Sequence, residues 1–152
     1  MITIYELITR LVLAVILGGA VGWERQKAKK PAGLRTHILV SLGSAAFTLA
    51  SFLAGPAITG QTMAVLRTGA IDHTRIAAGI LIGIGFLGAG TIIRSGENII
   101  GLTTAASIWI VAAIGMACGF GLYSLAVITG VLVILTLFVL EKIEEKSEIK
   151  KM

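Results

Sequence analysis

The sequence predicts an all-α integral membrane protein, built as a bundle of five transmembrane helices. Of its 152 residues, 56% are hydrophobic and 14% are charged, and the mean hydropathy is +0.95. Soluble domains carry charge on about a quarter of their residues, so this composition excludes an ordinary soluble domain. In addition, apolar runs near the roughly 20 residues that cross a bilayer recur along the chain, with short polar connections between them.

The five expected spans share this apolar character and cover residues 4–23, 37–53, 76–94, 103–118 and 122–140. The first residues lack the basic region that opens a signal peptide, so we expect the first run to remain as a span. We expect one membrane domain over residues 1–141 and a charged cytoplasmic tail over residues 142–152.

The charges are concentrated in the connections. With five spans, ten of the 13 Lys and Arg residues fall on one side of the membrane and three on the other. By the positive-inside rule, the N-terminus is outside and the C-terminus is cytoplasmic. This placement also explains the net charge of +5 without nucleic acid as a partner.

Glycines recur at helical spacing in spans one, three and four. Small residues four apart let membrane helices approach closely, because association in lipid relies on van der Waals packing. The glycines expected to pack helices are Gly18, Gly22, Gly79, Gly83, Gly85, Gly88, Gly90, Gly115 and Gly119. The alternative for the glycine-rich run in span three is a locally unwound segment beside an ion path, as in broken transporter helices.

Hydroxyl side chains recur every three or four residues in span two, at Ser41, Ser44, Thr48 and Ser51. Residues at this spacing share one helix face, where hydroxyls can bond back to the helix or across to a neighbour. Packing in the bundle core is the favoured interpretation, and lining of a polar path is the alternative.

Several stretches occur in the order and with the spacing of one known family. They are GxxxGWERQ with AGLRT (residues 18–26 and 32–36), Asp72 with RIAA (75–78), GIGFLGAGTIIR (83–94) and GLTTAASIWIVAAIGMACG (101–119). Over about residues 17–129, the chain resembles the MgtC/SapB family of bacterial inner-membrane proteins. The resemblance implies a five-span protein of the bacterial inner membrane that is linked to growth in low magnesium.

Members of this family are often described as components of a magnesium transporter. The resemblance also implies that, in some pathogens, members of the family are linked to survival inside host cells and to restraint of the F-type ATP synthase. Gly79 and Ile82 stand where many relatives have polar residues. Virulence-associated members carry a soluble C-terminal domain, and this chain looks like the short form without it.

If Mg²⁺ is the ligand or substrate, its site should offer oxygen atoms, because Mg²⁺ is a hard cation. Glu24 and Asp72 are the predicted metal-binding residues. We expect Glu24 on the cytoplasmic side and Asp72 on the outer side, so they would form the two mouths of one route. The other polar candidates for the path are Arg25, Arg35, Arg75, Thr91, Arg94, Thr103, Thr104 and Ser107. Alternatively, Glu24 simply pairs with Arg25, Arg35 or Arg94.

The sequence has neither a P-loop nor an H-E-x-x-H motif, so we do not expect an enzyme. Two functions remain. The first is a role in magnesium homeostasis as a Mg²⁺ transporter component. The alternative is a regulatory protein that binds another membrane complex, such as the F-type ATP synthase. The glycine faces also predict a homodimer.

Overall fold

The structure is a computed structural model that describes the backbone of residues 2–59 and 73–149 and the side chains of residues 2–53 and 75–143. Its elements, in chain order, are α1 (Ile4–Lys27), α2 (Leu34–Thr59), α4 (His73–Ala89), β1 (Ile93–Ser95), β2 (Asn98–Ile100), α5 (Leu102–Phe120) and α6 (Tyr123–Ile149). The described part of the chain is therefore helical apart from one short antiparallel hairpin and the connections.

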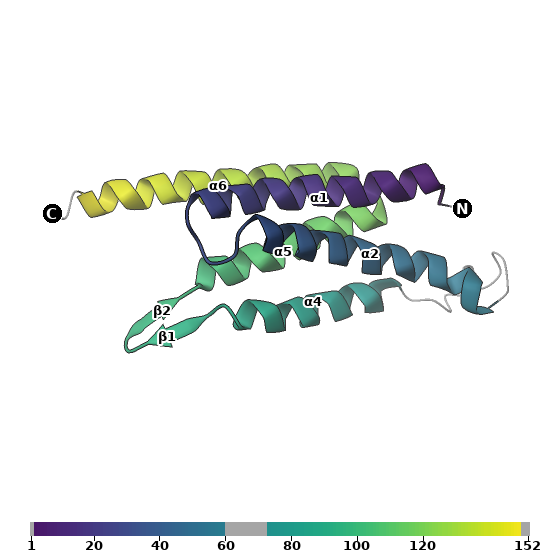
Figure 1. The fold of residues 1–152 in the computed structure, drawn as a ribbon, viewed down its shortest axis with the longest axis horizontal. Helices are drawn as coiled ribbons and strands as arrows, with labels where there is room; N and C mark the ends of the chain where they lie inside the picture. The colour runs from purple at the N-terminus through teal and green to yellow at the C-terminus, as the bar shows by residue number, and fades with distance from the viewer. Residues whose placement is uncertain (1, 60–72, 150–152) are drawn as a thin grey trace.

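The five helices run in alternating directions, so the two termini lie at opposite ends of the bundle (Figure 1). Helix α5 is central and contacts α1, α2, α4 and α6. The core between α1, α2, α5 and α6 is made mainly of small and aliphatic side chains, among them Ala14, Val21, Ala45 and Val111. Short side chains let the helix axes come close, which is how membrane helices gain packing energy.

Four of the described helical segments are long and apolar enough to cross a membrane: Ile4–Lys27, Leu34–Leu53, Leu102–Phe120 and Tyr123–Ile143. The fifth, Arg75–Ala89, is apolar but shorter. An apolar helix with a mostly exposed surface is stable in lipid, where its backbone polar groups are satisfied within the helix. The chain is thus a multi-pass membrane protein, as the composition predicts.

The prediction of a continuous helix over residues 76–94 is wrong at its C-terminal end. Helix α4 ends at Ala89, and Arg94 lies in β1, where it pairs with Ile99 of β2. The Thr91 and Ile92 N–H groups donate to the Gly88 and Ala89 carbonyls three residues back, so the last turn tightens and the α-helical pattern ends. The β-branched residues that follow favour extended backbone. Conversely, α4 is helical throughout, so a segment unwound within residues 73–89 is excluded.

Glycines of α1 and α5 bring α2 into close contact with both helices. A Cβ added at Gly18 would lie 2.6 Å from Ser41 Cβ, and one added at Gly22 would lie 2.8 Å from Leu34 Cα. At Gly119 it would lie 2.7 Å from Thr48 Cβ, and at Gly115 it would collide with the Ser41 carbonyl. No larger residue fits at these contacts.

Glycines of α4 behave differently. A Cβ added at Gly79, Gly83 or Gly85 would meet no atom within 4 Å, and one at Gly88 would only touch Ala105. Gly90 lies in the turn beyond the helix, so it does not extend the glycine face as predicted. The described residues therefore leave α4 uncovered at Gly79, Gly83 and Gly85.

Candidate functional site

A polar cavity of about 450 Å³ lies at the end of the bundle where α1 ends and α5 begins. Its walls come from α1, the connection after it, the hairpin, the first turn of α5 and the C-terminal half of α6 (Figure 1). The polar lining residues are Arg25, Lys30, Thr103, Thr104, Thr136 and Glu141. Three predicted site residues, Arg25, Thr103 and Thr104, thus meet at one place.

Arg25 reaches from the last turn of α1 to the first turn of α5. It is 3% exposed, and its Nη2 donates to Thr104 Oγ1 at 3.1 Å. Its Nε is buried and has no hydrogen-bond partner among the described residues. A buried guanidinium with an unused donor is energetically unfavourable, so the described residues satisfy Arg25 only in part.

Two carboxylates lie at the same end. The one ion pair among the described side chains joins Lys30 Nζ to Glu141 Oε1 at 3.3 Å. Glu24 Oε2 is buried with no hydrogen-bond partner in the described residues. Among the described side chains, Glu24 forms none of the ion pairs considered in the sequence, with Arg25, Arg35 or Arg94, although Arg25 and Lys30 attract its charge and Glu141 repels it.

His37 links α2 to α5 beneath this cavity. The side chain is fully buried; its Nδ1 lies 2.9 Å from the Gly33 carbonyl and its Nε2 lies 3.1 Å from Ser107 Oγ. Because a carbonyl only accepts, Nδ1 carries the proton. The Ser107 hydroxyl then shares its hydrogen between His37 and the Thr104 carbonyl, 2.8 Å away. This network includes the predicted Ser107 and ties it to Thr104.

Lys30, His37, Thr136 and Glu141 were not among the predicted site residues. Lys30 belongs to the densest charged run in the chain, which is a usable signal. His37 is a lone histidine in an apolar span, which is also a usable signal. Nothing local in the sequence marks Glu141, because its partner Lys30 is distant along the chain.

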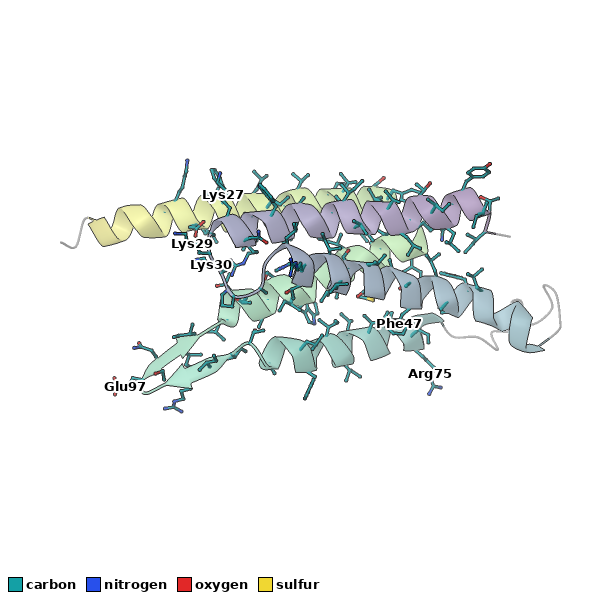
Figure 2. All side chains as sticks on the ribbon, viewed as in Figure 1. Lys27, Lys29, Lys30, Phe47, Arg75 and Glu97 are labelled. Atoms are coloured by element: carbon teal, nitrogen blue, oxygen red, sulfur yellow. The ribbon has the colours of Figure 1, made fainter. Side chains whose placement is uncertain are left out.

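The other predicted polar residues lie outside the cavity. Arg35 and Arg94 are exposed, and Arg94 Nε donates to the Gly96 carbonyl at 3.1 Å within the hairpin. Thr91 closes the turn after α4. Arg75 lies at the other end of the bundle (Figure 2). Asp72, the second tentative metal-binding residue, lies outside the described residues.

The hydroxyls of α2 face the bundle interior and are buried. Ser41 Oγ donates to the Ala14 carbonyl of α1 at 2.8 Å, and Thr48 donates to the Ser44 carbonyl at 2.8 Å. Ser51 donates to the Thr48 carbonyl at 2.6 Å. These bonds support packing in the core rather than the lining of a polar path. In the part of the chain that the structure describes, no three His, Cys, Asp or Glu side chains gather in a way that could hold a metal ion.

An apolar groove of about 580 Å³ separates α2 from α4. Its α2 wall includes Leu39, Gly43 and Phe47, and its α4 wall includes Gly79 and Gly83. Phe47 of α2 and Arg75 of α4 mark its two walls in Figure 2. The groove opens onto the surface of the bundle and not into the tightly packed interface between α1, α2 and α5.

Comparison with known proteins decides the family. A sequence model described as the MgtC family matches residues 11–146. The chain belongs to the MgtC family. This match covers four of the five helices completely or nearly so, and it includes both the polar cavity and the open face of α4. The resemblance found in the sequence is thereby confirmed.

Curated relatives in the MgtC family share over two-fifths of the aligned residues. "Putative magnesium transporter YhiD" of Escherichia coli (strain K12) is 45% identical over 138 residues, which cover 91% of this chain and 62% of the relative. "Protein MgtC" of Brucella abortus (strain 2308) is 45% identical over 121 residues, which cover 80% of this chain and 45% of the relative.

"Protein MgtC" of Salmonella typhimurium (strain LT2) is 41% identical over 130 residues, covering 86% of this chain and 50% of the relative. The chain therefore spans about half to three-fifths of the length of these relatives. No solved structure matches it.

Proposed function

We propose that this MgtC-family chain acts in magnesium homeostasis as a five-span protein of the bacterial inner membrane, with its N-terminus outside and its C-terminus in the cytoplasm. The name of the Escherichia coli relative supports the magnesium role. The orientation is supported by the clustering of Lys27, Lys29 and Lys30 toward the end of the bundle where α6 ends (Figures 1 and 2). Such an excess of basic residues is typical of the cytoplasmic side.

In this proposal, the chain is a regulator without enzymatic activity that binds a transmembrane helix of another membrane protein. The open groove between α2 and α4 carries this proposal. Gly79 and Gly83 line it and form a GxxxG pair, and a Cβ added at either would meet no atom of the described residues within 4 Å. A small-residue face against an apolar wall is the surface on which membrane helices associate. The F-type ATP synthase is the first complex to test, and a second copy of this chain is the competing occupant.

The experiment that tests this proposal places a large side chain in the groove between α2 and α4. Gly83→Leu should abolish both growth in low magnesium and co-purification of the partner, because its side chain would occupy the space of the docked helix. Gly85→Leu is the matched control, since Gly85 lies on the same helix, also meets nothing within 4 Å and does not line the groove. Complementation of a deletion strain and affinity purification from membranes measure the two effects.

Equal growth of the two variants at equal membrane levels would contradict the regulatory proposal. If the partner retained on the wild-type protein is another copy of the same chain, tested by co-purification of two differently tagged copies, the groove is a homodimer interface instead. Loss of growth in both variants, with both proteins folded, would mean that the lipid-facing side of α4 acts without a specific groove.

Mg²⁺ transport is the second candidate function. The observation that favours it is the Glu24 carboxylate oxygen that is buried without a partner near a second carboxylate, Glu141. Carboxylates are preferred Mg²⁺ ligands. If the chain conducts Mg²⁺, proteoliposomes should take up Mg²⁺ into an enclosed dye, and Glu24→Gln and Asp72→Asn should abolish the uptake. Absence of flux through folded, oriented protein would exclude this candidate.

A further inference from the structure

The polar cavity has a feature that neither candidate function uses: apart from Glu141, each of its polar lining side chains can donate a hydrogen bond. Helix α5 begins at its wall with Leu102, Thr103 and Thr104, and the N-cap residue Gly101 provides no side-chain cap. The first backbone N–H groups of a helix have no intrahelical acceptor, and the helix dipole makes this end attractive to anions. Thus one wall of the cavity presents uncapped donors.

A second, independent observation concerns Arg25. This side chain lines the same cavity and is 3% exposed, and its buried Nε has no partner among the described residues. Its single hydrogen bond, to Thr104, fixes the guanidinium beside the first turn of α5. A guanidinium held in this way matches the oxygens of a phosphate group.

The charged and apolar walls of the cavity restrict the class of ligand further. Lys30 adds a second cation but is partly neutralised by Glu141, with which it pairs at 3.3 Å. The remaining walls include Ile99, Leu102, Leu137 and Leu140, which are apolar. A ligand that matches both the basic and the apolar walls carries a negatively charged phosphate group attached to an apolar chain. Basic pockets between membrane helices on the cytoplasmic side bind lipid headgroups in this manner.

We propose that the cavity formed by Arg25, Lys30 and the first turn of α5 binds a phosphate group, as carried by an anionic phospholipid. The proposal does not depend on the regulatory function, because it concerns the bundle end and not the α4 groove. It is an alternative to Mg²⁺ binding at the same end, where Glu141 lines the cavity. Glu24 and Glu141 oppose the anion, so the removal of a carboxylate should tighten binding. Tighter binding after removal of a carboxylate distinguishes a phosphate site from a Mg²⁺ site, because a Mg²⁺ site would bind its ion more weakly.

The test uses the whole purified chain in maltoside micelles, which contain no phosphate. Three probes are titrated separately by calorimetry: short-chain phosphatidylglycerol, inorganic phosphate and MgCl₂. We expect one molecule of phosphatidylglycerol to bind per chain. Lys30→Gln should weaken this binding about tenfold, as expected for loss of one charge-assisted hydrogen bond, and Glu141→Gln should strengthen it severalfold. Lys27→Gln, a matched loss of charge outside the cavity, should leave it unchanged.

If Lys30→Gln does not fold, Thr103→Val takes its place, because Thr103 is exposed and lines the cavity. Binding of inorganic phosphate with the same response to the variants, and no binding of lipid, would support the phosphate site with a soluble ligand. Three results would overturn the proposal. These are no binding of either phosphate compound, equal weakening by Lys27→Gln and Lys30→Gln, or Mg²⁺ binding that Glu141→Gln abolishes.

Discussion

Replacement of Gly115 by alanine should destabilise the bundle by at least about 2 kcal/mol, a large change for a single methyl group. The added Cβ would collide with the backbone carbonyl of Ser41, and backbone cannot move aside as a flexible side chain can. To accept the methyl group, α2 and α5 must separate. Separation would also strain the neighbouring contact of Gly119 with Thr48.

The free energy of unfolding in mixed detergent micelles measures this effect. Gly85→Ala is the control, because Gly85 is also in a helix but a Cβ there meets nothing within 4 Å. Alanine has the higher helix propensity by roughly 1 kcal/mol, so the control should be neutral or stabilising. If Gly115→Ala were as stable as the control, the close approach of α2 and α5 would be wrong.

Replacement of His37 by alanine should cost about 2–4 kcal/mol of stability, because it leaves a cavity and removes two hydrogen bonds. His37 is fully buried, and its two ring nitrogens contact Gly33 and Ser107. The substitution also releases α5 from the start of α2, so the Arg25–Thr104 contact one turn away should loosen.

A double-mutant cycle isolates the interhelical bond. The coupling between His37→Ala and Ser107→Ala should be about 0.6–1.7 kcal/mol, the range for hydrogen bonds between membrane helices. Thr136→Ala serves as the control, because this exposed hydroxyl donates only to its own helix at the Leu132 carbonyl. Additive effects of the His37 and Ser107 substitutions would show that the two side chains do not interact.

The sequence could predict much of the fold. Long apolar runs specify membrane helices by length and hydropathy alone, and four of the described helices fulfil that expectation. The end of α4 was predicted wrongly because residues 90–93 carry no charge and Ile92 and Ile93 are apolar enough to continue a span. Hydropathy cannot distinguish an apolar helix from an apolar hairpin.

Packing at the glycines could be predicted only as a tendency. By spacing alone, Gly18 and Gly22 could pack against a partner or within the chain, and the structure shows that a Cβ there would meet α2 of the same chain. Larger residues at these positions would disrupt the bundle itself and could not report on a partner. The same GxxxG spacing at Gly79 and Gly83 faces an open groove, which makes these the informative positions.

The sequence by itself determined the membrane character, the family and the separation of basic and apolar segments, because each of these is a local property of residues in order. Only the tertiary structure decided that Arg25 meets Thr104, that Lys30 pairs with Glu141 and that His37 bridges to Ser107. Arg25 and Thr104 are 79 positions apart. Contacts of this kind depend on how each helix is rotated and shifted against its neighbours, and that is set by packing in three dimensions.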